Sequence, residues 1–111
     1  MVHRSVRNPA RVQLRELRLK AGIEQYELAA VMGIDTTEVS RFETGQRDAM
    51  PRGLGLTDYL AALERVRTAD WNQIAFALGV TVREVHLVRR RRRQDYIEAL
   101  RRLTATTEPA A

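Results

Sequence analysis

Two segments of the chain repeat one pattern of apolar and small residues at a spacing of 46 positions. Each apolar position of the first segment maps onto an apolar position of the second, the alanine onto an alanine and the glycine onto a glycine. The first set is Leu28, Ala29, Met32, Gly33, Ile34, Val39 and Phe42, and the second is Ile74, Ala75, Leu78, Gly79, Val80, Val85 and Val88. Because a repeat at fixed spacing marks a repeated supersecondary unit, we expect two copies of one unit.

The repeated pattern fits two short helices joined by a tight turn. Ala29 and Ala75 supply a small residue where the two helices approach each other. Gly33 and Gly79 supply a turn residue that tolerates a positive φ. The apolar residues that follow face inward, which leaves the opposite face of the second helix free to enter a DNA major groove.

Capping and periodicity signals predict helices along the whole chain, so the expected fold class is all-α. The first helix is expected from Pro9 to Gly22, and the others span about residues 25–32, 36–44, 57–67, 71–78 and 82–103. Residues 48–56 read as a loop. The expected caps are Asp35, Thr57, Asp70 and Thr81, and the expected inward stripes are Leu14, Leu17 and Ala21 in the first helix and Leu60, Leu63 and Arg67 in the fourth.

The expected organisation is two small helical units with irregular ends. Residues 1–8 are expected to form a flexible basic arm and residues 9–67 the first domain. Residues 68–103 are expected to form a second unit that ends in a long basic helix, and residues 104–111 a frayed tail.

Composition narrows the function classes. The 111 residues include no cysteine, and no apolar run approaches the ~18 residues of a membrane span. His3 and His86 are far apart and lack partners for a metal site. No signature of a nucleophile with its base or of a phosphate loop is present, so we expect no enzyme, no cofactor, no metal, no membrane partner and a cytoplasmic location.

Charge points to a polyanion as partner. The net charge is +5, and 18 of the 19 basic residues are arginine. The arginine cluster, residues 89–93, cannot lie on one helix face because successive residues are ~100° apart. Such a cluster repels itself unless an anion relieves it, which predicts phosphate contacts by Arg89, Arg90 and Arg93.

Residues 14–47, LRELRLKAGIEQYELAAVMGIDTTEVSRFETGQR, carry further hallmarks. These are Gln25 at the start of the second helix, Leu28-Ala29, Gly33-Ile34 and the run Val39-Ser40-Arg41-Phe42-Glu43 before Gly45. The stretch from residue 10 to about 66 resembles the Cro/C1-type (XRE) helix-turn-helix family of phage repressors and bacterial transcriptional regulators. It departs from the family pattern at Glu24, where Ser or Thr is usual, and at Pro51, which comes later than usual.

The resemblance implies site residues in the first unit. Base edges would be read by Thr36, Thr37, Ser40 and Arg41. Phosphates would be held by Gln25, Thr44, Arg47 and Arg52. In this family the position of Glu43 often pairs with an arginine of the first helix, here Arg15 or Arg18.

The second unit resembles the motif only generically, because Trp71 stands where Gln25 would and is expected in the core. Spacing places Val82, Arg83, His86 and Arg90 on its outward face, with Arg83 and His86 as candidate base contacts. The predicted function is a sequence-specific regulator that binds double-stranded DNA, and a monomer on an asymmetric site is one of the binding modes expected.

Two alternatives remain open at this stage. The second unit is alternatively a protein-interaction module, as in an antitoxin or a polymerase-binding factor. The other alternative is a homodimer formed through residues 94–103, because Tyr96, Leu100 and Leu103 form an apolar stripe. The operator sequence and the sign of regulation do not follow from the sequence.

Overall fold

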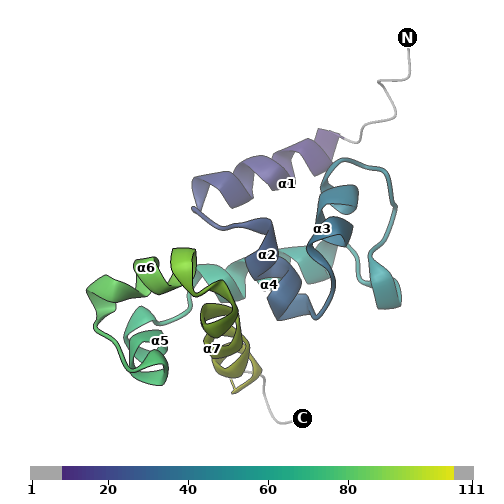
Figure 1. Cartoon of the computed structure of the whole chain (residues 1–111). Helices are drawn as coiled ribbons and strands as arrows, with labels where there is room; N and C mark the ends of the chain where they lie inside the picture. The colour runs from purple at the N-terminus through teal and green to yellow at the C-terminus, as the bar shows by residue number, and fades with distance from the viewer. Residues whose placement is uncertain (1–8, 107–111) are drawn as a thin grey trace. The chain divides into compact units, whose positions relative to one another are not determined.

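The computed structural model describes residues 9–106 and is all-helical over that range (Figure 1). An isolated bridge between Met50 and Leu54 is the only β-type pairing among these residues. The chain divides into two compact units, Met1–Arg67 and Thr68–Ala111. The expected arm at residues 1–8 lies outside the described residues, as do residues 107–111.

The first unit contains four α-helices: α1 (Pro9–Lys20), α2 (Gln25–Met32), α3 (Thr36–Glu43) and α4 (Leu56–Arg67). A short 3₁₀ turn, η2 (Pro51–Gly53), interrupts the loop before α4. Helix α2 packs on α3 and α4, and α1 packs on α3. Fully buried Leu28, Val39, Phe42 and Tyr59 form the centre of this core. The Phe42 and Tyr59 rings lie 6.0 Å apart, so the apolar face of α3 is held against α4.

Two predicted stripes of the first unit are confirmed at Leu14 and Leu63 and wrong at Leu17 and Leu60. Leu17 is 48% exposed, and over residues 11–20 the buried side chains are Leu14 and Arg18. Leu60 is likewise exposed, and α4 buries Tyr59, Ala62, Leu63 and Val66 instead. Both shifts have one cause, because a polar network around Arg18 and Tyr59 fixes which side of each helix faces inward.

The second unit contains α5 (Trp71–Leu78), α6 (Val82–Arg91) and α7 (Arg93–Thr106). The predicted cap of α5 is confirmed, since Asp70 Oδ1 accepts a hydrogen bond from the Asn72 amide at 2.8 Å. The three helices pack on one another. Their buried apolar side chains are Ile74, Ala75, Val85, Val88, Tyr96, Ile97, Ala99 and Leu100.

The expected single helix over residues 82–103 is wrong. The helix breaks at Arg92, whose φ of −124° and ψ of 58° are not helical. The break allows α7 to pack on both α5 and α6, which a straight helix would prevent. It falls within the arginine cluster, where a continuous helix would stack like charges on successive turns.

The new direction of α7 also corrects the predicted dimer stripe and the predicted tail. Tyr96 and Leu100 are 1% and 0% exposed, so they are part of the protein's own core and do not form a free apolar face. Helix α7 continues to Thr106 rather than fraying from Thr104. Thr104 is buried, and its hydroxyl donates to the Leu100 carbonyl at 2.9 Å.

Candidate nucleic-acid interface

The turn between α2 and α3 is closed by backbone hydrogen bonds around Gly33. Gly33 has a φ of 72°, and its amide donates to Ala30 O at 3.3 Å. The Ile34 amide donates to Ala29 O at 3.0 Å. A left-handed residue at this point ends α2 and turns the chain into α3 without steric cost to a glycine.

The turn between α5 and α6 has the same backbone geometry. Gly79 has a φ of 71°, and its amide donates to Phe76 O at 3.2 Å. The Val80 amide donates to Ala75 O at 3.0 Å. The starts of α5 and α6 also lie 46 residues after the starts of α2 and α3. The sequence repeat is therefore a repeat of backbone structure.

Helix α3 separates an apolar face from a polar one. Val39 and Phe42 are completely buried, whereas Thr36 and Thr37 are exposed. Ser40 and Arg41 are half-buried. These four expected base contacts therefore lie on one short helix, and its inner face is fixed by packing.

Arg41 is held by a neighbour on its own helix. Its Nη1 lies 3.3 Å from Glu38 Oε2, in an i,i+3 ion pair. The Arg41 side chain keeps 40% of its surface exposed, so its guanidinium remains accessible to a ligand. A partly exposed pair of this kind contributes little stability but restricts the side chain's orientation.

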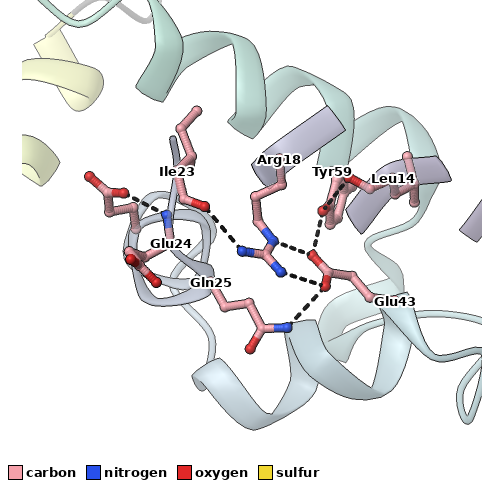
Figure 2. A network of polar contacts seen from close by, with 8 residues as sticks. Leu14, Arg18, Ile23, Glu24, Gln25, Glu43 and Tyr59 are labelled. Atoms are coloured by element: carbon pink, nitrogen blue, oxygen red, sulfur yellow. Dashed lines mark hydrogen bonds and ion pairs between the residues drawn. The ribbon is translucent and has the colours of Figure 1, made fainter. Parts of the chain in front are cut away.

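The carboxylate of Glu43 joins all four helices of the first unit (Figure 2). Arg18 of α1 grips it with two hydrogen bonds, from Nε at 2.7 Å and from Nη2 at 3.0 Å. Gln25 donates from Nε2 at 2.9 Å, and the Tyr59 hydroxyl donates at 2.5 Å. The pairing with Arg18, one of the two expected partners, is confirmed. Glu43 thus fixes the end of α3 relative to the start of α2.

The network shifts the pKa of each of its ionisable groups. Burial alone would raise the pKa of Glu43, but hydrogen bonds from Arg18, Tyr59 and Gln25 outweigh it and lower that pKa. Burial would lower the pKa of Arg18, and the bond to Glu43 reverses this and raises it. The pKa of Tyr59 is raised, first by burial and then by the adjacent carboxylate. The charged pair is therefore stable over the physiological pH range.

Gln25 is half-buried at the first position of α2. One of its two amide hydrogens is directed at Glu43, so its position relative to α3 is fixed before any ligand binds. Glu24, the departure from the family pattern, takes part in a capping box in which its own amide donates to Glu27 Oε1 at 2.7 Å. A carboxylate pair thus replaces the usual hydroxyl cap.

The other expected phosphate contacts of this unit lie beyond α3. Thr44 and Arg47 are exposed, and the Thr44 hydroxyl donates to Arg41 O at 3.2 Å. Arg52 has an unusual positive φ of 64°, and its guanidinium donates to Gly33 O at 3.1 Å and to Met32 O. Arg52 therefore stabilises the end of α2 in this structure.

Arg11 supports the C-terminal end of α3 and was not expected from the sequence. Its Nη1 donates to Phe42 O at 2.7 Å and to Arg47 O at 2.9 Å, and its Nη2 to Asp48 O at 3.1 Å. The guanidinium also lies 3.8 Å from the centroid of the Phe42 ring. Local sequence patterns could not predict these contacts, because the partners of Arg11 are 31 to 37 residues away.

In the second unit, the expected contacts lie on the outward side of α6. Arg83, His86 and Arg90 are exposed, and Val82 is 43% exposed. Arg93 at the start of α7 is exposed, while Arg89 and Trp71 are half-buried. Leu87, which was not among the residues expected from the sequence, is 39% exposed on the same helix. The sequence repeat could have indicated this position, because Leu87 is equivalent to Arg41, which is an expected base contact of the first unit.

The remaining described residues offer little other chemistry. Within residues 9–106, no group of three or more metal-ligating side chains is close enough to hold an ion. Over the same range no helix combines the length and the apolar character needed to cross a bilayer. Every fully buried side-chain nitrogen or oxygen in the described part has a hydrogen-bond partner.

Comparison with protein families gives a match within the first unit. A helix-turn-helix family model matches residues 14–52, which include α2, α3, their turn and most of α1. Searches of curated proteins and of solved structures gave no match. The second unit lies outside the matched segment. Residues 14–52 are therefore similar to the helix-turn-helix domains of the Cro/C1 type, a family of DNA-binding transcription regulators.

Proposed function

We propose that the protein is a sequence-specific regulator of the phage repressor or Cro kind, with α3 in the major groove and α6 as a second reading helix. The observation that carries the proposal is the polar outer face of α3, set on a fully buried inner face. Thr37 and Arg41 would contact base edges, and Gln25 would hold a phosphate. Arginine pairs well with the O6 and N7 acceptors of guanine in that groove.

The fixed positions of these groups support the assignment. Gln25 and the end of α3 share Glu43 as a partner, so the phosphate contact and the base contacts are set relative to one another. Arg11 and Arg18 stabilise the same helix from behind. A reading helix held in this way enters a groove without first losing conformational freedom.

The second reading helix rests on the structural repeat. Helix α6 follows the same turn as α3 and presents Arg83, His86 and Arg90 on its exposed side. Arg89 and Arg93 would add phosphate contacts near the end of α6. Because the two outer faces differ in sequence, one chain would recognise an asymmetric site without a partner.

One observation favours a protein partner for the second unit. Phe76 on α5 is 89% exposed, and residues 71–82 contain no charged side chain. Charge depletion together with an aromatic side chain is typical of the centre of a protein interface. This candidate function predicts that Phe76→Ala abolishes capture of a protein and leaves DNA affinity unchanged.

Binding-site selection on random duplex DNA, followed by affinity measurements, tests the proposal. Arg41→Ala should lower affinity for the selected site by about 1–3 kcal/mol and have a much smaller effect on random DNA. Arg15→Ala, an exposed arginine of α1, serves as the matched control and should behave like the wild type. An equal loss on both DNAs would make Arg41 a phosphate contact instead.

A further inference from the structure

Helix α6 exposes two aliphatic side chains among charged and polar ones. Val82 is 43% exposed and Leu87 is 39% exposed, although the helix already has buried Val85 and Val88 for its core. The other exposed side chains of α6 are Arg83, Glu84, His86, Arg90 and Arg91. The two aliphatic residues therefore contribute little to the core of the unit and remain available to a ligand.

The repeat shows which positions of α3 these two residues correspond to. Val82 is equivalent to Thr36 and Leu87 to Arg41, both of which lie on the proposed reading face of α3. The equivalence is structural as well, since the two turns share their φ values and hydrogen bonds. Val82 and Leu87 thus occupy positions from which side chains meet base edges in the first unit's proposed complex.

An acidic residue behaves differently in the two copies. In α3, Glu38 pairs with Arg41. The equivalent Glu84 accepts hydrogen bonds from the Thr81 amide at 2.9 Å and from its hydroxyl at 3.1 Å. The carboxylate of Glu84 is thus held at the start of α6, whereas that of Glu38 pairs with the side chain at the position equivalent to Leu87.

We propose that Val82 and Leu87 recognise the C5 methyl groups of pyrimidines, so that the second unit selects thymine at the positions they face. This inference rests on the proposed role of α6 as a second reading helix. In the major groove, the thymine methyl is the apolar group among the base edges, and aliphatic side chains recognise it by excluding water from both surfaces. Arg83 and His86, between them on the helix, add hydrogen-bonding groups to the same face.

Removing single methyl groups from the DNA tests the inference. Each thymine of the selected site is replaced in turn by deoxyuridine, and the affinity of the full chain is measured at fixed salt. Wild-type protein should bind about fourfold more weakly at one or two positions, as expected for the loss of one buried methyl-sized group. Leu87→Ala and Val82→Ala should each remove the sensitivity at one of those positions.

A control variant and a second base analogue sharpen the test. Leu60→Ala changes a leucine of matched exposure, 41%, on α4, and should keep the wild-type pattern. Replacing the sensitive T·A pair by 5-methylcytosine·guanine or by cytosine·guanine separates the methyl group from the rest of thymine. Tighter binding of the methylated pair supports recognition of the methyl group itself.

The outcomes distinguish this inference from the proposed function. If Arg83→Ala with Arg90→Ala leaves affinity unchanged, α6 does not contact DNA, and both the second reading helix of the proposed function and the methyl inference fail, whereas the role proposed for α3 is tested separately by Arg41→Ala. If that double variant weakens binding but deoxyuridine has no effect, or the same effect in all variants, the methyl inference alone is overturned. Circular dichroism of each variant checks that these exposed substitutions leave the helices folded.

Discussion

The Tyr59 hydroxyl lies 2.5 Å from Oε2 of Glu43, and this bond joins α4 to the last residue of α3. The other oxygen of the same carboxylate accepts from Arg18 and Gln25. A single buried carboxylate therefore fixes the end of the proposed reading helix against the three other helices of its unit.

Glu43→Gln is expected to destabilise the first unit strongly, by about 3–5 kcal/mol, because the buried guanidinium of Arg18 would lose its counter-charge. Tyr59→Phe should cost about 1.5–3 kcal/mol, the usual contribution of a hydrogen bond to a charged group. Urea unfolding measures both. Glu64→Gln breaks an exposed ion pair with Arg67 and should leave the free energy of unfolding nearly unchanged. Equal losses in the buried and exposed variants would contradict this.

Stability should fall in acid because of Glu43. Its pKa is lowered in the folded protein, so the unfolded chain takes up the proton first. The stabilisation is complete above the unfolded pKa of about 4.3 and is lost as the pH falls through the lower folded pKa. The free energy of unfolding, measured from pH 7 to pH 2, should decrease below about pH 4.3 and do so less steeply in Glu43→Gln. Identical pH profiles would count against this role of Glu43.

Several helix ends could be predicted from single residues, but the expected cap Thr57 lies inside α4, which begins at Leu56. Gly33 and Gly79 end α2 and α5 as expected, and Asp70 caps α5. The inward face of α1 could not be predicted. Helical periodicity considers only apolar residues, so it favours Leu17 and does not predict a buried arginine whose partner is distant in the sequence. The break at Arg92 depends on packing of α7 against α5 and α6, which local sequence does not encode.

In the candidate site, too, features set by local sequence could be predicted, and features set by distant contacts could not. The exposed position of Thr36 and Thr37 followed from the pattern of buried residues on α3. The supports from Arg11 and Tyr59 did not, because each acts on residues 16 to 37 positions away. The guanidinium of Arg52, an expected phosphate contact, donates to the carbonyls that end α2, and local sequence did not predict this contact.

Gly33→Val and Gly79→Val are each expected to destabilise the protein by roughly 1–2 kcal/mol, because a β-branched residue resists a positive φ. The two turns have φ values of 72° and 71°, so the penalties should be similar. Thermal unfolding provides the measurement. Gly55→Val is the matched control, since Gly55 is not among the residues with positive φ and a Cβ there would meet no atom within 4 Å. An unchanged melting temperature for Gly79→Val would refute the assigned turn.

Replacing the arginine cluster, residues 89–93, by glutamine should weaken DNA binding broadly. Each phosphate contact contributes about −0.9 to the slope of log K against log salt concentration, so loss of two or more contacts should flatten the slope by roughly two units. Titration at several salt concentrations measures the slope. Arg15→Gln with Lys20→Gln removes exposed charges of α1 and should leave the slope nearly unchanged. A slope that does not respond to loss of the cluster would exclude it from the interface.

In the proposed complex, one chain reads DNA through both α3 and α6. Footprinting on the selected site, combined with the measured number of chains per site, tests it most directly. We expect one chain on an asymmetric footprint, which becomes shorter at one end when Arg83 and Arg90 are replaced by alanine. A symmetric footprint occupied by two chains and unaffected by those replacements would contradict it.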